Sequence, residues 1–364
     1  MNEITTNFLV ESLIFKGEEH NPFLAPRGVW MCGDRLFVAD TGQNRVFIWN
    51  ERPTSTFAPA DVVLGQSETG DTSRNAGDLV QASTLQYPSG IWSDGQKLIV
   101  ADAWNHRVLI WHTFPQKHGQ PADVVVGQQD FVSNKPNVAG IGNDPNAKSL
   151  NWPYGVFSDG TQLWIADTGN RRVLYYEQIP TNNYAAASGV IGKDDFEQRD
   201  YDNAQPIWPY SVRVSPEGKM AVTDTQYYRV LLWQDWHNAL KAPADVIIGQ
   251  ENFESNGQNQ YRLQPASFTL NWCYDSFFQE DTFWVADTGN SRIMKFNPIP
   301  DKNNPAAAGL VGHDDFGTGS ENKKTMFGTE NALYWPFSIC IDGNDMAIAD
   351  TGNHRVVIKN LKDQ

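Results

Sequence analysis

The amino-acid sequence predicts an all-β fold: a six-bladed β-propeller of four-stranded antiparallel blades, closed by an N-terminal strand that completes the last blade. Three observations predict it. One motif occurs six times, apolar runs of strand length flank each copy, and the sixth repeat lacks an outer strand that the N-terminus can supply. A repeat at nearly constant spacing indicates a repeat architecture whatever the chain length. We therefore expect residues 1–364 to form a single domain.

The repeated motif is an Asp followed five positions later by an Arg, within the pattern D-T-G-N-x-R. The six pairs, 57–65 residues apart, are Asp40/Arg45, Asp102/Arg107, Asp167/Arg172, Asp224/Arg229, Asp287/Arg292 and Asp350/Arg355. Apolar strands precede each Asp and follow each Arg, and the Gly and Asn between them are typical of tight turns. We interpret the charged pairs as ties that hold the turns and neighbouring blades. A ring of six functional sites is the alternative.

Each unit also has an upstream inner strand and a downstream outer strand, which together make a four-stranded blade. The expected blades are 24–66, 85–128, 150–193, 207–250, 270–313 and 333–360. Residues 8–17 are predicted to add the outer strand of the last blade, which removes two exposed sheet edges. Long connections at 67–84, 129–149, 194–206, 251–269 and 314–332 are expected on the same face as the Asp-to-Arg turns, and such loops tend to carry function.

The six motifs resemble the signature of NHL-repeat proteins, in which an apolar strand is followed by V-A-D-T-x-N-x-R-V and a second strand. The resemblance covers essentially the whole chain and is strongest at 163–177, 283–297 and 346–360. The second copy departs from it at Ala103-Trp104, and the fourth reads Thr225-Gln226-Tyr227-Tyr228. The resemblance implies a propeller that binds a protein partner. It also implies an alternative, because six-bladed relatives include metal-dependent lactonases, strictosidine-synthase-like proteins and amidating lyases.

The starts of the inner strands are predicted to lie at the mouth of the central channel. The candidate ligand- or partner-binding residues there are Arg27, Tyr154, Tyr210, Tyr274, Phe337 and Asp275. Asp275 replaces the Gly or Ser of the other copies; it could face Arg27 and hold a metal or substrate, or make a local hydrogen bond. We expect Trp152, Trp208, Trp272 and Trp335 to wedge between blades as core, with an aromatic platform for a partner as the alternative.

Metal ligands and catalytic groups have no clear signature. The acidic pairs Asp194-Asp195 and Asp314-Asp315 are interpreted as solvated turns, with a divalent-cation site as the alternative, and each precedes a Phe that we expect to anchor its loop. No His or Cys spacing is typical of zinc. We therefore expect no resident cofactor and name no catalytic residue. Ca²⁺ or Zn²⁺ in the channel remains the alternative.

Charge and composition narrow the partners. The chain has 28 Lys and Arg against 43 Asp and Glu, a net charge of −15, which disfavours nucleic acids and anionic membranes. The isolated Cys32, Cys273 and Cys340, and an N-terminus without the pattern of a secretory signal, predict a cytoplasmic protein.

Two hypotheses for the function follow. The favoured one is a non-catalytic scaffold that holds a protein partner on its loop-rich aromatic face, for example as an accessory subunit of a redox or metalloenzyme complex. The alternative is a metal-dependent hydrolase or lyase that acts on a small molecule in the central channel.

Overall fold

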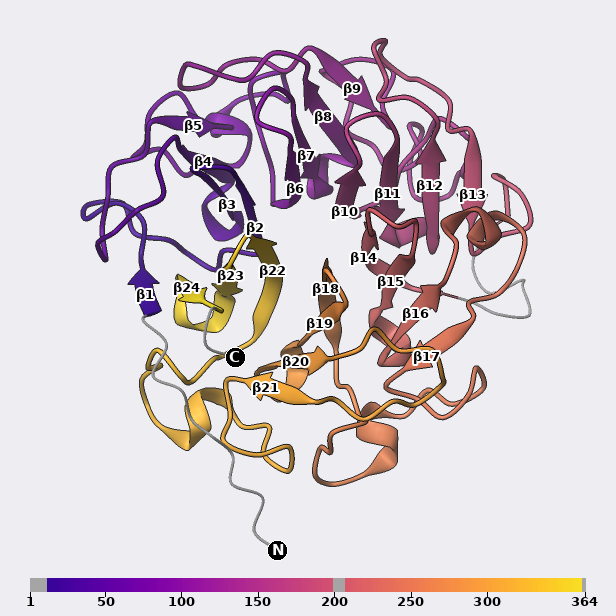
Figure 1. Cartoon of the computed structure of the whole chain (residues 1–364). Coiled ribbons are helices and arrows are strands. Elements are labelled where there is room, and N and C mark those ends of the chain that lie inside the picture. The colour runs from indigo at the N-terminus through magenta and orange to yellow at the C-terminus, as the bar shows by residue number, and fades with distance from the viewer. Residues whose placement is uncertain (1–11, 199–206, 362–364) are drawn as a thin grey trace, which may run out of the picture.

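The computed structural model describes residues 12–198 and 207–361, and it shows six four-stranded antiparallel blades in a ring (Figure 1). This confirms the predicted fold class. Blade 1 consists of β2 (Gly28–Cys32), β3 (Arg35–Asp40), β4 (Arg45–Trp49) and β5 (Val62–Leu64). Blade 2 consists of β6 (Pro88–Ser93), β7 (Leu98–Asp102), β8 (Arg107–Trp111) and β9 (Val124–Val126). Blade 3 consists of β10 (Pro153–Ser158), β11 (Leu163–Asp167), β12 (Arg172–Tyr176) and β13 (Gly189–Ile191).

Blades 4 and 5 repeat this order, from the inner strand outward. Blade 4 consists of β14 (Pro209–Val214), β15 (Met220–Asp224), β16 (Arg229–Trp233) and β17 (Val246–Ile248). Blade 5 consists of β18 (Cys273–Gln279), β19 (Thr282–Asp287), β20 (Arg292–Phe296) and β21 (Gly309–Val311). Blade 6 contains β22 (Pro336–Asp342), β23 (Asp345–Asp350) and β24 (Arg355–Asn360). The connection between β16 and β17 contains a short 3-10 helix, η6 (Trp236–Leu240).

The N-terminal strand closes the ring as predicted. β1 (Ser12–Phe15) pairs antiparallel with β24 as the outer strand of blade 6, so that Leu13 lies opposite Ile358. The expected strand also included 8–11, which lie outside the described residues. The Phe15 side chain is fully buried and meets Trp49 of blade 1 edge to face, with ring centroids 4.9 Å apart. One short strand therefore joins the first blade to the last.

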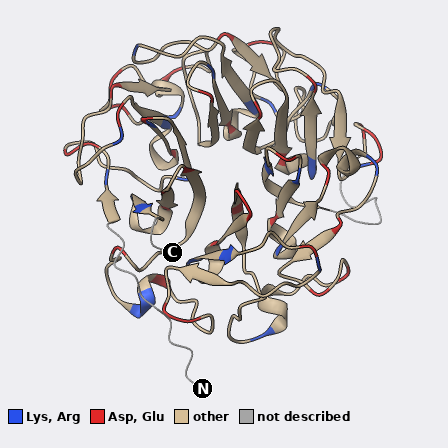
Figure 2. Ribbon diagram, viewed as in Figure 1, with Lys and Arg blue, Asp and Glu red and all other residues tan. Residues whose placement is uncertain are grey.

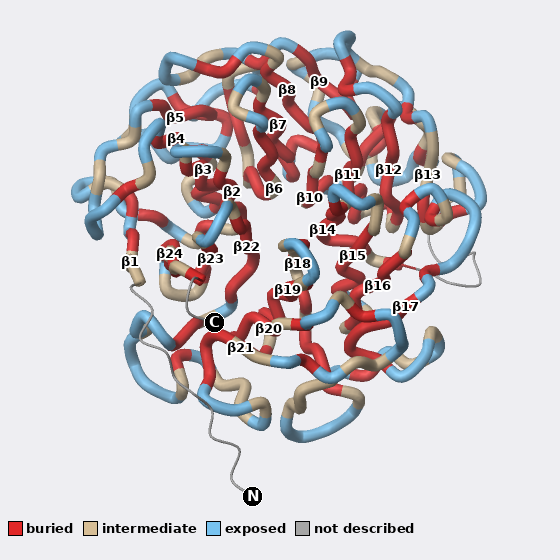
Figure 3. Tube along the Cα trace, in the orientation of Figure 1, coloured by how far each residue is buried: buried red, intermediate tan, exposed pale blue. Residues whose placement is uncertain are grey.

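The core lies within and between the blades, where nearly every strand residue is buried (Figure 3). Valine, isoleucine and leucine dominate these strands because branched side chains pack well on a pleated surface. Each inner strand also packs against the inner strands of both neighbouring blades. The channel is therefore walled by β2, β6, β10, β14, β18 and β22.

The D-T-G-N-x-R segments form one turn of 3-10 helix between the second and third strands of every blade. These turns are η1 (Thr41–Gln43), η3 (Ala103–Asn105), η4 (Thr168–Asn170), η5 (Thr225–Tyr227), η8 (Thr288–Asn290) and η10 (Thr351–Asn353). The residue after each turn is left-handed, with φ of 52–56°. In an antiparallel meander these turns and the inter-blade loops share one end of the blades, which we call the mouth face.

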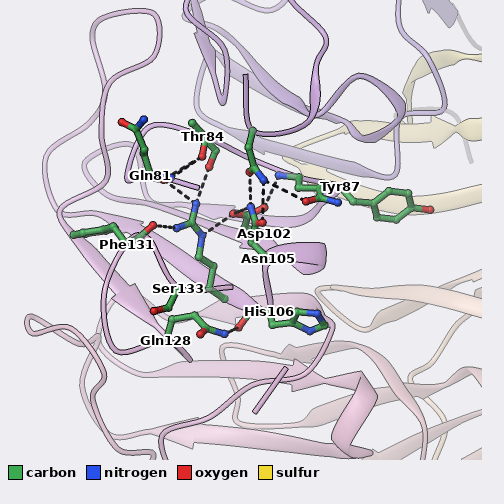
Figure 4. Close-up of polar contacts among 12 residues, drawn as sticks. Gln81, Thr84, Tyr87, Asp102, Asn105, His106, Gln128, Phe131 and Ser133 are labelled. Carbon is green, nitrogen blue, oxygen red and sulfur yellow. Dashed lines mark hydrogen bonds and ion pairs between the residues drawn. The ribbon is translucent and has the colours of Figure 1, made fainter. Parts of the chain in front are cut away.

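Each Asp and Arg of the motif forms a buried hydrogen-bonded group that we call the Asp–Arg node. In blade 2, Asp102 accepts from Arg107 Nε at 2.7 Å, from Asn105 Nδ2 at 2.8 Å and from the backbone N–H of Gln86 at 2.7 Å (Figure 4). Arg107 also donates to the carbonyl oxygens of three loop residues: Gln81, Thr84 and Phe131. All six Asp–Arg pairs form, with side chains at most 4% exposed, which supports the predicted role as ties.

A threonine after the node Asp ties five of the six blades to the next one. In blade 3, the Thr168 hydroxyl donates to the carbonyl oxygen of Pro209 in blade 4 at 2.7 Å. Equivalent bonds of 2.5–2.7 Å leave the turns of blades 1, 4, 5 and 6. Ala103 stands at this position in blade 2 and has no hydroxyl to donate.

Candidate functional site: the channel mouth

β-Bulges place the aromatic residues at the channel mouth. The pairing of inner and second strands shifts register between Pro153 and Gly155, and at the equivalent places in blades 2, 4, 5 and 6. A bulge adds one residue to a strand and re-aims its side chain. In blades 3 to 6 the extra residues are Tyr154, Tyr210, Tyr274 and Phe337, four of the candidates predicted from the sequence.

These four aromatic residues form a continuous cluster. Together with Arg27 and Tyr87 they make up a group of six residues that we call the channel-mouth ring. Tyr154 stacks on Tyr210 with centroids 4.7 Å apart and planes 10° apart, and Tyr210 meets Tyr274 edge to face at 4.4 Å. Phe337 lies 4.2 Å from Tyr274. Aromatic pairs in these geometries stabilise by about 0.5–1.5 kcal/mol each. The ring is therefore a packed structure rather than an open pocket.

Arg27 completes the ring from blade 1. Its guanidinium carbon lies 4.2 Å from the centroid of Phe337 and 5.0 Å from that of Tyr87, and Nη1 donates to the Tyr210 hydroxyl at 3.4 Å. Burial raises the pKa of Tyr87 to about 12 and raises the pKa of Tyr154 and Tyr274 further. These three phenols therefore stay neutral at physiological pH, and the cation–π contacts hold the arginine.

Tyr87 is the member of the ring that the sequence reasoning missed. Blade 2 has Ser89 at the bulge, which is too small to reach its neighbours, and Tyr87 contributes instead. It stacks on Trp104 at 4.6 Å and lies 6.3 Å from Tyr154. The available signal was the position of Tyr87, two places before Ser89, where blades 3 to 6 have a tryptophan.

Asp275 lies just beneath the ring and is paired with Arg213 rather than with Arg27. The Asp275–Arg213 distance is 2.8 Å, and the carboxylate also accepts from Ser338 Oγ at 2.9 Å and from the backbone N–H of Ile339 at 3.1 Å. Asp275 is 2% exposed. These contacts match the local hydrogen-bond alternative, and they occupy the carboxylate oxygens that a metal would need. Arg213 was not among the predicted residues.

The space beneath the ring is small. A cavity of about 20 Å³ lies between the ring and the Asp275–Arg213 pair. This volume suits roughly one water molecule. Among residues 12–198 and 207–361, no three His, Cys, Asp or Glu side chains gather as a metal site requires. The space at this level of the channel, between the ring and the Asp275–Arg213 pair, is therefore narrow.

The expectation that the tryptophans before the bulges are core between the blades was wrong for Trp152 and Trp335. Trp152 and Trp335 are 43% and 45% exposed, and Trp208 and Trp272 are half-buried. Trp152, Trp272 and Trp335 also have left-handed backbone, with φ of 48–51°. A bulky residue in the left-handed region costs about 1–2 kcal/mol. These rings lie around the mouth face.

The acidic pairs behave as turn residues. Asp195 accepts from the backbone N–H groups of Glu197 and Gln198, and Asp315 from that of Gly317. The following Phe196 and Phe316 are held through their carbonyl oxygens by the node residues Arg172 and Arg292. The predicted anchoring is thus present, through the backbone. Residues 199–206 of the predicted loop 194–206 lie outside the described part of the chain.

Of the comparisons with known proteins, only the one with solved structures found similar chains. No protein-family model matches the chain, and no curated protein matches its sequence. Among solved structures, the chain is similar to hydrazine synthase from Kuenenia stuttgartiensis, with a TM-score of 0.51 and 10% identity over all of both chains. A protein of unknown function from Bacteroides thetaiotaomicron has a TM-score of 0.49 and 11% identity, over 96% of this chain and 75% of the other.

Virginiamycin B lyase from Staphylococcus aureus is a third similar structure, with a TM-score of 0.45 and 13% identity over 98% of this chain and all of the other. At these identities the likeness concerns the fold alone. In the described parts of the chain, no helix is long and apolar enough to cross a membrane.

Proposed function

We propose that this protein is a non-catalytic binding protein of the NHL-repeat type, which holds a protein partner on its mouth face. The observation that carries the proposal is the set of aromatic residues in left-handed backbone at that face. Trp152, Trp272, Trp335 and Tyr87 all have φ of 48–57°, where Gly or Asn would be less strained. Residues in strained backbone cluster at binding and active sites, although Ala25 at the equivalent place of blade 1 is left-handed as well. Exposed Trp and Tyr are the residues most enriched at binding hot spots.

The charge of the protein favours a cationic partner. The net charge is −15, and two mouth-face tryptophans already carry an arginine of this chain: Arg171 lies 4.3 Å above Trp208, and Arg74 lies 5.6 Å above Trp104. Trp152 and Trp335 have no Lys or Arg above them among the described residues. Lys or Arg side chains of a partner would complete the same contact there. A basic partner surface would also be steered toward the acidic protein.

An enzyme that acts in the channel is the weaker candidate. The hydrolase or lyase alternative needs polar groups free to act on a substrate, whereas the Asp275 carboxylate at the channel mouth is already bonded to Arg213, to Ser338 Oγ and to the backbone N–H of Ile339. The candidates Arg27, Tyr154, Tyr210, Tyr274 and Phe337 contact one another and so shape the floor of the binding face. The partner contacts are assigned to the tryptophans around them. An accessory role in a larger complex fits this arrangement.

The test is an affinity pull-down from native lysate with the tagged protein and a Trp152→Asn/Trp335→Asn variant. Asn tolerates the left-handed backbone, so we expect the variant to fold. The matched control is Gln96→Ala/Thr161→Ala, at exposed positions in the hairpins of the opposite face. We expect one stoichiometric partner, retained by the control and lost by the tryptophan variant. Equal capture by both variants, or no stoichiometric partner at all, would refute the proposal.

A further inference from the structure

Four inter-blade loops present an exposed aliphatic residue at the same position of a second repeated motif. Each loop contains an Asn followed four residues later by Leu, Ile or Met, in the segments 75–79, 137–141, 259–263 and 322–326. We call the last residues the loop tips: Leu79, Ile141, Leu263 and Met326. Their exposures are 77%, 76%, 104% and 84%. Single exposed aliphatic residues are ordinary on a protein surface, but recurrence at one position in four loops is not.

The loops that carry the tips are held in place by a contact that recurs with them. The amides of Asn75 and Asn105 bond reciprocally, at 2.8 and 3.3 Å, and Asn105 also donates to the blade 2 node at Asp102. Equivalent amide pairs join the other three loops to their turns: Asn137/Asn170, Asn259/Asn290 and Asn322/Asn353. The loop Asn and the residue after it are left-handed in all four copies. The amide pairs therefore fix each loop at the Asn four residues before its tip, against the turn of the following blade.

The charge around the tips selects among possible occupants. The four loops 67–84, 129–149, 251–269 and 314–332 carry eleven Asp and Glu against six Lys and Arg, and both charges occur on the outer loops in Figure 2. The balance is acidic over the loops as a whole, while Arg262 precedes Leu263, and Lys323 and Lys324 precede Met326. An acidic rim repels anionic lipid headgroups, and it also repels the same rim of a second copy. A protein surface with basic residues around apolar sockets matches both the aliphatic tips and the charge.

We propose that the four loop tips form a crown of anchors for one basic protein partner that spans several blades. This inference rests on the proposed function and extends it from the tryptophans at the centre of the mouth face to the loops around its rim, which are exposed in Figure 3. Each tip inserts its aliphatic side chain into an apolar socket, and partner lysines and arginines face the loop carboxylates. Simultaneous use of several tips requires a folded partner surface rather than a short peptide.

The experiment places the photo-reactive residue p-benzoylphenylalanine at one loop tip at a time in the full chain, which is irradiated in native lysate. Matched controls carry the same residue at Gln96, Thr161 or Asp281, exposed positions in hairpins of the opposite face. Circular dichroism checks that each protein folds. We expect all four tips, and none of the controls, to cross-link to the same protein, through peptides in which Lys or Arg flank apolar residues.

Other outcomes overturn the inference. Cross-links to a second copy of this chain, to lipid, or to unrelated proteins at different tips would do so, as would yields no higher than those of the controls. The tryptophan variant could lose a partner to which none of the loop tips forms a cross-link. In that case the inference about the loop tips is wrong, while the proposed function stands. For the identified partner, Leu263→Ser is expected to weaken binding by about tenfold and Gln96→Ser to have no effect.

Discussion

The Asp–Arg nodes and the channel mouth differ in how closely the six blades agree. At the nodes, all six blades use the same two residues, bury them and saturate them with hydrogen bonds. At the mouth, the equivalent bulge positions hold an arginine, a serine, three tyrosines and a phenylalanine. Uniformity therefore marks what every blade needs in order to fold. Divergence at the mouth is what the proposed binding face requires, because a partner contacts each blade differently.

The largest expected effect comes from breaking one node. Arg172→Ala leaves Asp167 buried without its cation and frees the carbonyl oxygens of Asn146, Ser149 and Phe196. Removing one partner of a buried ion pair costs about 3–5 kcal/mol. Denaturant unfolding should show a loss of this size for Arg172→Ala, and a smaller loss for Arg172→Lys, which keeps the charge. A loss below about 1 kcal/mol for Arg172→Ala would contradict the structural role of the nodes.

A pH-dependent effect is expected at His106, which links the blade 2 turn to the mouth. Its Nδ1 accepts from the backbone N–H of Trp152 at 3.1 Å, and burial lowers its pKa from 6.5 to about 4. Between these values the unfolded chain binds a proton that the folded chain excludes. The contribution of His106 to the free energy of unfolding is therefore fully present above pH 6.5. As the pH drops to 4, the free energy of unfolding falls by about 2–3 kcal/mol.

The matched variant for this effect is His106→Asn. Asn44 holds the equivalent place in blade 1, where its Oδ1 accepts from the backbone N–H of Tyr87 at 3.1 Å. We expect wild type and variant to have similar free energies of unfolding at pH 7.5, and the variant to lose about 2 kcal/mol less by pH 4. Parallel curves across that range would show that His106 does not titrate as the structure implies.

A smaller effect is expected at the threonine ties. Thr168→Ala removes the bond to the Pro209 carbonyl and should cost about 1 kcal/mol, the usual net value of one hydrogen bond. Thr168→Ser keeps the hydroxyl and should cost less. Ala103 shows that one blade tolerates the loss. If Thr168→Ala and Thr168→Ser unfold at the same denaturant concentration, the hydroxyl makes no net contribution.

The smallest effect on stability is expected at the mouth. In Trp335→Asn the relief of left-handed strain offsets the loss of half-buried aromatic contact, so the free energy of unfolding should change by less than about 1 kcal/mol. Thermal unfolding by circular dichroism measures this. A loss of 3 kcal/mol or more would return Trp335 to the structural core and remove it from the binding surface.

The sequence was sufficient to predict the fold because the node residues recur at a fixed separation and can be read without contacts. It also located Tyr154, Tyr210, Tyr274 and Phe337, because they follow the conspicuous inner-strand starts. It failed for Trp335 because the exposure of that side chain depends on how the start of the inner strand sits at the mouth face, which a sequence position does not reveal. The N-x-x-x-aliphatic pattern of the loops was not predicted from the sequence. Its signal was the Asn, a residue that tolerates the left-handed backbone found there.

Arg213 illustrates a different limit of the sequence. It stands in an inner strand where other blades have Trp30, Phe157 or Cys340, and a charge at such a position indicates a buried partner. Identifying that partner as Asp275 required the structure, because the two residues belong to different blades.

The most direct test of the binding face is amide hydrogen exchange on the partner-bound and free protein. We predict that partner binding slows amide hydrogen exchange in the inter-blade loops and beside Trp152 and Trp335. We predict no change in exchange rate in the hairpins of the opposite face, at 94–97, 159–162 and 280–281. Protection confined to those hairpins, or to the outer strands, would contradict the claim that this propeller holds its partner on the mouth face.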